Sequence, residues 1–573
     1  MRIRRVVVGA ILLVLVGGAV WVVLWRPLEV SGPAPDDGYT RVRGVVHVHT
    51  TLSDGGGTPA EVAAAAKRAG LGFVAITDHN NLDAKPFEGY HDGVLVLVGS
   101  EISTASSGHV LGLGLREDPP FRFSGDPLDA LDDVRLLGGH AFAAHPSSPR
   151  ADFRWTAWDL PGPWGLELMN GDSQWRAAGW GRLLRTAALY GLHPGYALLG
   201  SLTPPDDTLA QWDRLLAARP VAGIAGADAH SRVVVRKERG VRFPSYESLF
   251  GLAVNHVLLD RPLSGEAAAD GHAIVDALAR GQGYMGLDAL APAEGFFFTA
   301  ESATARTTMG GTIAPLPAPR LRAGGRLPAG ARRRLVRDGQ AATEAETALD
   351  LPAPGPGVYR VEVRVPGWDV PWVLSNPIGV FAPAEAAARA ARAAFPDPAD
   401  PPAATTILDA FDGPTSFAAE FDASSAMETP VVVPGAGADG SGAARLSFRL
   451  GPPGPGRPYT WCALVSRQPR DLTGASGLVF SLRADRTYRI WVQVRDENPA
   501  SADEGTEWWF ASVRPGPEWR RVAVPFARLR SINPNSDGRL DLDRVRQLVF
   551  VLDPAAVEPG TQGAIWLDNL GLY

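Results

Sequence analysis

The sequence predicts an α/β protein, built as a (β/α) barrel with a parallel sheet and followed by two β-domains. Between residues 40 and 305, short apolar runs alternate with Ala- and Leu-rich helical stretches, as in repeated βα units. From about residue 306 the chain changes to short alternating runs broken by Gly and Pro, a pattern typical of β-sandwiches. A length of 573 residues is enough for three or four folded units.

The N-terminal residues predict a membrane anchor. Val6–Trp25 contains no charged residue, follows three arginines and is closed by Arg26. At ~1.5 Å per helical residue this run spans the ~30 Å hydrocarbon core of a bilayer, and the basic flank favours a cytoplasmic N-terminus. A cleaved signal peptide is the alternative, although no A-x-A-like site follows the run. In either case we expect the bulk of the chain outside the cytoplasm, periplasmic or extracellular.

The predicted domain boundaries follow these changes in composition. They are a membrane anchor and tether at 1–39, the barrel at 40–305, a small β-sandwich at 306–381, an Ala/Pro-rich linker at 382–405, and a β jelly-roll domain at 406–573.

Charge and cysteine content exclude some partners and sites. The net charge is -7 and the sequence pI about 5.9, so we expect no nucleic-acid partner. Cys462 is the single cysteine, which excludes an intrachain disulfide and a thiolate metal cluster. Any metal ion must therefore be held by nitrogen and oxygen ligands.

Polar side chains gather at the predicted ends of the barrel strands. The candidate metal ligands among them are His47, His49, Asp54, His79, Glu101, His109, His145, Asp228 and His230. His47 and His49 are two residues apart on a strand, so both point to the same side. One histidine at a strand end is usually a turn or surface residue. So many polar groups at one mouth would be costly to bury unless something pairs them, and a cluster of metal ions would do so.

The motifs around these residues resemble those of the PHP (polymerase and histidinol phosphatase) family. They are HVHTTLSDG, TDHN, GSE, GHVLGLG, AHP and ADAH, in this order, between about residues 45 and 231. The resemblance implies a distorted seven-stranded (β/α) PHP barrel, two or three divalent metal ions, and phosphoesterase activity. Within the family, the N-terminal segment and the small β-sandwich resemble the carbaryl-hydrolase-like metallohydrolases most.

The resemblance also implies a role for each candidate ligand. His47, His49, Glu101 and Asp228 would hold the first metal. Glu101 would bridge to a second metal, bound by His109 and His145. Asp54, His79 and His230 would hold a third, and some branches of the family have histidine in place of Asp54. The catalytic group implied is a metal-bridging hydroxide held by Glu101 and the other ligands. The donor set suits Zn, Mn or Fe without selecting among them.

Other residues near these motifs are weaker candidates. Arg150, Arg232 and Arg236 could bind a substrate phosphate, although arginine is the commonest charged surface residue of this chain. Glu167 and Asn170 end another strand, where they either support the site or simply satisfy a strand terminus. The second interpretation is the simpler one.

The C-terminal segment resembles carbohydrate-binding jelly rolls, in its opening LDAFD and closing IWLDNLGLY. The resemblance makes Asp409 and Asp568 candidate ligands of a structural calcium ion, although both could be turn residues. The tryptophans that could stack on sugar rings are Trp491, Trp508, Trp509 and Trp519. Because side chains alternate along a strand, some of these must instead belong to the core.

These observations predict a membrane-anchored, metal-dependent hydrolase of a small phosphoester, with a possible glycan ligand at the C-terminal domain. A first alternative is a carboxylic-ester or carbamate hydrolase that uses the same metals. A second is a non-catalytic cell-surface protein that binds glycan. The complete set of candidate ligands argues against lost activity.

Overall fold

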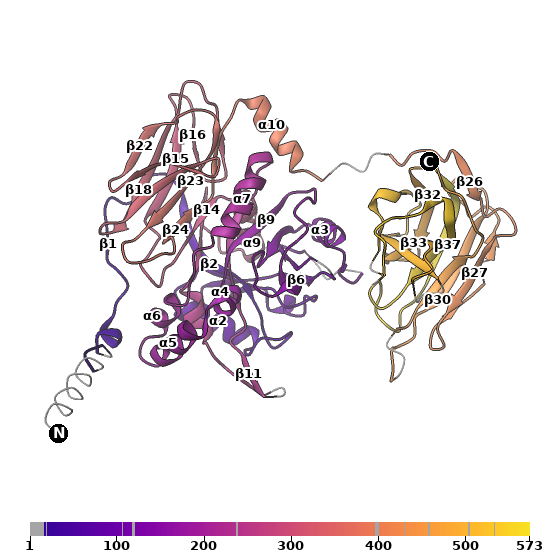
Figure 1. Cartoon of the computed structure of the whole chain (residues 1–573), viewed down its shortest axis with the longest axis horizontal. Helices are drawn as coiled ribbons and strands as arrows, with labels where there is room; N and C mark the ends of the chain where they lie inside the picture. Colours follow the sequence, from indigo (N-terminus) through magenta and orange to yellow (C-terminus); the bar gives the residue numbers. More distant parts are fainter. Residues whose placement is uncertain are drawn as a thin grey trace. The chain divides into compact units, whose positions relative to one another are not determined.

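The chain divides into two compact units, Met1–Asp118 with Gly125–Phe395 and Pro119–Ser124 with Pro396–Tyr573 (Figure 1). The computed structural model describes residues 16–18, 20–105, 107–116, 121–236, 239–395, 400–429, 431–455, 459–501, 505–531, 533 and 535–573, without the side chains of 234–241 and 431. The predicted α/β class is confirmed. The finer domain boundaries stay predictions, and the predicted small sandwich lies within the first unit.

In the part of the chain that the structure describes, no helix is both long and apolar enough to cross a membrane. Val6–Trp25 lies largely outside the described residues. The anchor therefore stays a prediction.

One mixed sheet carries the candidate site. Its strands pair in the order β5 (Val94–Val98), β3 (Phe73–Ile76), β2 (Thr40–Val48), β10 (Gly223–Ala229), β9 (Trp164–Asn170), β8 (His140–Ala144), β7 (His109–Leu113) and β6 (Ser100–Ser103). A bridge links His79, three residues after β3, to Glu101 in β6, and the sheet closes on itself. The strand count of seven implied by the resemblance stays a prediction.

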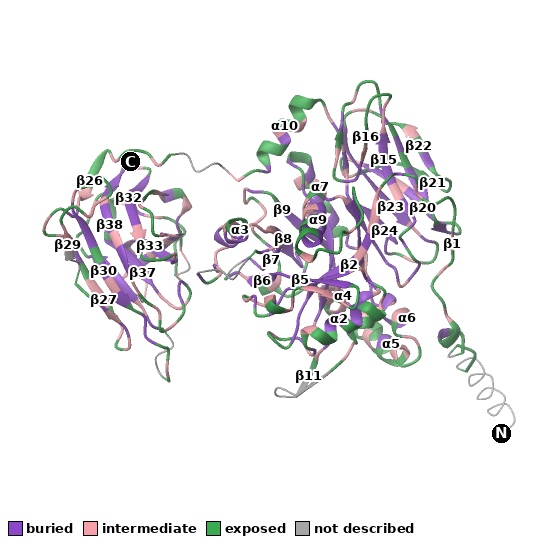
Figure 2. Ribbon diagram, turned by 180° about the vertical axis from the view of Figure 1, so that it is seen from behind, coloured by how far each residue is buried: buried purple, intermediate pink, exposed green. Residues whose placement is uncertain are grey.

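Parallel pairing explains the apolar runs of the sequence. The ladders from β5 through β3, β2, β10 and β9 to β8 are all parallel. Strands of this kind are covered on both faces, and every residue of β3 and β5 is buried. Figure 2 shows this buried interior.

Local signals set the ends of the surrounding helices. Helix α2 (Pro59–Arg68) begins with a capping box between Thr58 and Glu61, and with proline in its first turn. Helix α9 (Ala267–Arg280) ends at Gly281, whose φ of 68° is the left-handed conformation that glycine adopts readily.

The small sandwich continues the barrel sheet. Strand β14 (Gly283–Gly286) pairs with β24 (Val373–Ser375), which pairs with β23 (Gly357–Arg364). A separate four-stranded sheet contains β15 (Phe296–Glu301) and β18 (Arg320–Gly325). Shared backbone ladders explain why the change in sequence pattern near residue 306 does not separate two compact units.

The second unit contains a seven-stranded and a six-stranded antiparallel sheet. The first is centred on β30 (Ala443–Arg449), β38 (Gln562–Leu572) and β32 (Gly477–Ala484). The second contains β37 (Val545–Leu552), β33 (Ile490–Glu497) and β34 (Thr506–Val513). One hydrophobic core takes side chains from both sheets. The predicted β-architecture is thus present, and the jelly-roll connection stays a prediction.

Candidate metal centre

The nine candidate ligands come together at one end of the barrel strands. Seven of them line a single cavity of about 510 Å³, namely Asp54, His79, Glu101, His109, His145, Asp228 and His230. The other two, His47 and His49, are completely buried. Carboxyl ends of parallel strands share one edge of a sheet, which is why residues far apart in sequence meet here.

Glu101 lies at the junction of the cluster. Its Oε2 is 3.1 Å from Nε2 of both His47 and His49. Its Oε1 is 2.6 Å from Nδ1 of His109 and 2.7 Å from Nε2 of His145. Nδ1 of His79 lies 3.3 Å from Oε2. One carboxylate thus contacts five imidazoles, an arrangement that allows it to share two cations.

Four groups of nitrogen and oxygen atoms are close enough to hold metal ions, with all atoms of a group within 4.8 Å of one another. The groups are His47–His49–Glu101, His47–His145–Asp228, His79–Glu101–His109 and His49–Asp54–His79–His230. Every candidate ligand from the barrel belongs to at least one of them.

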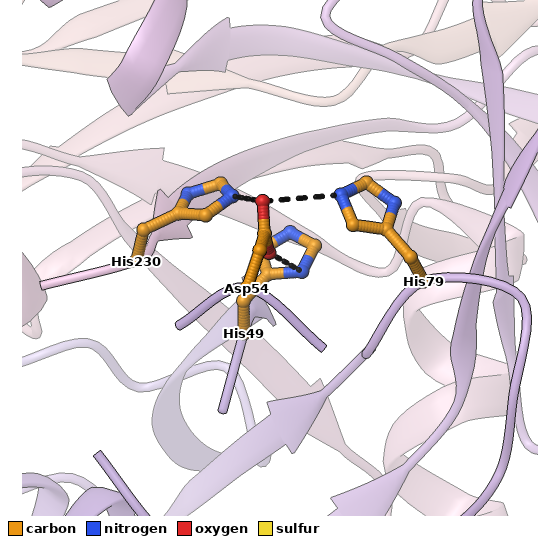
Figure 3. A group of neighbouring side chains, drawn as sticks. All are labelled: His49, Asp54, His79 and His230. Carbon is orange, nitrogen blue, oxygen red and sulfur yellow. Dashed lines mark ion pairs between the residues drawn. The ribbon is translucent and has the colours of Figure 1, made fainter. Parts of the chain in front are cut away.

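The fourth group is the most open to solvent. Figure 3 shows its three imidazoles arranged around Asp54. Asp54 Oδ2 lies 3.2 Å from Nε2 of His230 and 3.7 Å from Nε2 of His79. Asp54 Oδ1 is 3.6 Å from Nδ1 of His49. The Asp54 side chain is 50% exposed, so this group is open to solvent while the groups around Glu101 are buried.

Unpaired buried nitrogens show that the residues fit metal ions. Nε2 of His47, both ring nitrogens of His49 and Nδ1 of His79 are buried without a hydrogen-bond partner. Buried polar atoms without partners cost free energy, and native proteins rarely leave them so. Imidazole nitrogen and carboxylate oxygen are ligands that suit zinc, manganese and iron.

Glu167 positions two of the candidate ligands. This fully buried carboxylate lies 2.6 Å from Nδ1 of His47 and accepts the backbone N–H of His145 at 2.7 Å. Asn170 donates to it at 2.9 Å. The simpler interpretation, that Glu167 only satisfies a strand end, is therefore incomplete, because Glu167 keeps Nε2 of His47 turned toward Glu101.

Further hydrogen bonds fix the site. Nδ1 of His145 bonds the carbonyl of Phe153 at 2.8 Å, which leaves Nε2 facing Glu101. Asp78 accepts the backbone N–H and the hydroxyl of Thr50, both at 2.7 Å, and so holds the turn that leads to Asp54. Metal-binding histidines are commonly oriented by such partners.

Backbone strain coincides with the cluster. His47, His145 and Asp228 have φ values of 66°, 31° and 45°. Residues other than glycine rarely adopt this left-handed region, and such strain persists where the surroundings enforce it, often at functional sites.

The ionisable groups hold one another in charged forms. Burial by itself lowers the pKa of His145, but the Glu101 carboxylate outweighs it and raises this pKa to about 9. Burial and Asp54 act on His230 in the same way, again with a pKa of about 9. Burial raises the pKa of Glu101, yet the surrounding imidazoles hold it well below its usual range. The carboxylates of this cluster thus favour positive charge beside them.

The candidate phosphate-binding arginines differ in placement. Arg150 and Arg232 line the cavity, and the Arg150 guanidinium lies 3.7 Å from the centre of the Phe153 ring. The side chain of Arg236 lies outside the described residues. Sequence reasoning missed Arg176 in α4 (Gly171–Ala177), which also lines the cavity and pairs with Asp172 one turn earlier. The i, i+4 spacing of these two residues after a strand end was the available signal.

Part of the cavity lining is apolar, and we call it the apolar wall. It consists of Trp175, Leu198, Leu202, Phe243, Leu249 and Leu252. None of these residues was a sequence-based candidate, because apolar positions in helices are usually core positions.

The candidate calcium ligands of the second unit do not form a group. Asp409 accepts the backbone N–H of Phe411 and the hydroxyl of Thr415, so its own turn satisfies it. Asp568 accepts the N–H of Ala438 at 2.8 Å, and its other oxygen is buried without a partner. Among the described residues, the potential metal groups all lie in the barrel.

Two of the four candidate sugar-stacking tryptophans are buried. Trp491 and Trp509 donate to Asp553 and Asp496, at 3.0 and 3.1 Å. Trp508 and Trp519 are half-buried. The Arg495 guanidinium lies 3.7 Å from the centre of the Trp508 ring.

Comparisons with known proteins give one relative in sequence. No family model matches the chain. This chain is 36% identical over 119 residues to the uncharacterised protein MJ1587 of Methanocaldococcus jannaschii. The match covers 18% of this chain and 67% of that protein.

Solved structures resemble parts of the chain only weakly. A two-domain Bacteroides vulgatus protein, described as containing a predicted PHP-like metal-dependent phosphoesterase, is 16% identical with a TM-score of 0.31, over 62% of this chain and 99% of that one. A family 11 carbohydrate-binding module from Clostridium thermocellum, in complex with a mixed-linked tetrasaccharide, is 19% identical with a TM-score of 0.24, over 29% of this chain and 94% of that one. Such low scores establish no function for this chain.

Proposed function

We propose that this chain, which belongs to the same family as the uncharacterised archaeal protein MJ1587, is a metal-dependent hydrolase of phosphoesters. The observation that carries the proposal is the convergence of buried imidazoles with unpaired nitrogens on one carboxylate, Glu101. The resemblance of its motifs to those of the PHP family supports the same reaction class.

The proposed ligand assignment follows that resemblance. His47, His49, Glu101 and Asp228 would hold one ion, Glu101 with His109 and His145 a second, and Asp54, His79 and His230 a third. When bound, zinc, manganese or iron ions of this kind lower the pKa of water and neutralise charge on phosphoryl oxygens.

The chain's own residues orient the reacting groups. Glu167 and the Phe153 carbonyl keep His47 and His145 in the ring orientation that faces Glu101. Arg150 and Arg232 place positive charge on the same cavity, where each can donate to a phosphate oxygen.

The apolar wall favours substrates whose alcohol part is apolar. Trp175 and Phe243 lie with their ring centres 6.3 Å apart on this wall. A phosphoester with a compact apolar alcohol would place its phosphate on the ligands and its alcohol on the wall. The same wall suits an aryl carboxylic ester or carbamate, so ester hydrolysis by the same metals is the alternative.

The test is turnover by the full chain loaded with Mn or Zn. The panel contains cyclohexyl phosphate and inositol monophosphate, which share a six-membered ring but differ in polarity, together with a phosphodiester and aryl carboxyl and carbamate esters. We expect turnover of cyclohexyl phosphate that His47→Ala abolishes. His140→Ala is the matched control, because His140 lies on β8 but bonds Asp276 instead of the cluster.

The outcomes separate the proposals. Turnover only of carboxyl or carbamate esters would favour the alternative reaction. If metal binds the protein tightly and no substrate is turned over, the proposal of an enzyme loses its support, and a binding protein becomes the better interpretation.

For the second unit we propose glycan binding. Trp508 donates to Thr506 at 3.1 Å, and Thr506 and Gln547 line a cavity of about 440 Å³ with the charged residues Glu497 and Arg546. A partly exposed ring beside polar groups is typical of sugar sites. Affinity electrophoresis in soluble polysaccharides tests it, with Trp508→Ala expected to lose retardation and Trp519→Ala to keep it. A structural calcium ion at Asp568 and a membrane-anchored location outside the cytoplasm are further proposals.

A further inference from the structure

Helix α5 (Trp180–Tyr190) exposes large apolar side chains, while Leu183 and Leu189 are half-buried. The side chains of Trp180 and Leu184 are 82% and 68% exposed. The single fully buried residue of the helix is the polar Thr186, whose hydroxyl donates to the carbonyl of Ala197. Helices on the surface of a globular protein usually bury the apolar stripe and expose the polar one.

The exposed apolar residues form a continuous stripe. Trp180, Leu184 and Ala188 are spaced by four residues, which places them on one helix face, and all three are exposed. Leu192, just beyond the helix end, is also 40% exposed. Single exposed apolar side chains need no explanation, but a stripe of them marks an interaction surface.

The charge of this region suits an anionic partner. From Trp180 to Pro205 the sequence contains no Asp or Glu. Arg182 and Arg185 of α5 are both exposed. A helix with tryptophan and leucine on one face and arginine beside them has the composition of helices that lie in the headgroup region of a bilayer.

The end of the apolar N-terminal segment packs on α6 (Pro194–Leu199), the helix that follows α5. Trp21 and Trp25 both lie with their ring centres 5.3 Å from that of Tyr196, in this helix. Helix α6 packs on α5 through the bond from Thr186 to Ala197. Figure 1 shows α5 and α6 beside the described end of the N-terminal helix. Trp21 is itself 56% exposed.

We propose that the outer stripe of α5 lies in the interfacial layer of the bilayer that holds the N-terminal segment, with Trp180 and Leu184 inserted between lipid headgroups. This inference rests on the proposed anchoring. Because Leu198 and Leu202 follow α5 and belong to the apolar wall of the metal cavity, docking would hold that wall close to the membrane surface.

The test uses an environment-sensitive fluorophore on a single cysteine. Cys462 is completely buried, so Leu184→Cys in the full chain offers one reactive thiol. The matched control is Leu136→Cys, at a 49% exposed leucine on a different helix, α3 (Pro127–Leu136). With vesicles of phosphatidylethanolamine and phosphatidylglycerol, we expect a shift to shorter wavelength and quenching by spin-labelled lipids at position 184 but not at 136.

Flotation of the same vesicles separates docking from anchoring. If the full chain floats and the label at 184 behaves like the label at 136, anchoring stands and docking is wrong. If the chain does not float, both are wrong. If the fluorescence at position 184 shifts without lipid, and the shift grows with protein concentration, the partner of the stripe is a second copy of the chain and the proposed docking to lipid is wrong.

Discussion

At the scale of single residues, a substitution of Glu167 tests whether the cluster binds metal ions. The variant Glu167→Gln keeps the volume of this buried side chain but removes the negative charge beside Nδ1 of His47. It also replaces one of the two acceptor oxygens, which serve His47 and the N–H of His145, with an NH2 donor. Loss of such an orienting partner typically weakens metal binding by about 10–100-fold. We expect that loss in titrations with zinc or manganese.

The control for this substitution is Glu266→Gln, at an exposed helix end where the side chain makes no cap bond. Equal metal affinity in Glu167→Gln and the parent chain would show that Glu167 only satisfies its strand. A large fall in the melting temperature of the metal-free variant would instead mean that the fold was disturbed.

Cys462 gives a pH-dependent prediction at the same scale. Burial raises the pKa of its thiol to about 11. Because this pKa is above that of an exposed thiol, the thiolate is scarce in the folded protein at pH 8. The stability that the protonated thiol contributes is fully present below the pKa of the exposed thiol and is lost as the pH rises toward 11. We expect no reaction with an aromatic disulfide reagent at pH 8 until guanidinium unfolds the chain. Prompt reaction of the folded protein would contradict the burial of this residue.

At the scale of elements, close approach of β9 and β10 explains a glycine next to the cluster. A Cβ on Gly226 of β10 would lie 1.8 Å from Oε1 of Glu167 on β9. We expect Gly226→Ala to displace Glu167, lower metal affinity and destabilise the fold by about 1–3 kcal/mol. Gly179→Ala, where a Cβ meets nothing within 4 Å, is the control that should leave both unchanged. A normal metal titration for Gly226→Ala would refute the role of this contact.

The sequence predicted the strands of the barrel better than the contacts between them. Alternation of apolar runs and helices predicted the strands, and their ends supplied the candidate ligands from His47 to His230 apart from Asp54, which lies in a turn after β2. The role of Glu167 was underestimated because it depends on the register between β9 and β10, which no local pattern encodes. The apolar wall was missed for a related reason. Residues such as Leu198 and Phe243 come from helices and loops whose packing partners are distant in sequence.

At the scale of the whole molecule, the two compact units differ in the ligands proposed for them. The potential metal groups among the described residues belong to the first unit, and the second has its own hydrophobic core. Units with separate cores are expected to unfold as separate transitions. A ligand that binds only the folded first unit stabilises only that unit.

Calorimetry of the full chain tests this expectation. Zinc or manganese at a hundredfold excess over its Kd should stabilise one transition by about 2.7 kcal/mol, and a chelator should reverse the gain. His47→Ala should remove most of the shift and leave the second transition unchanged. Calcium, by contrast, should move only the second transition, and only if the unpaired oxygen of Asp568 belongs to a real site. A zinc-dependent shift of the second transition would place the metal outside the cluster around Glu101 and would contradict the proposed function, which depends on metal binding there.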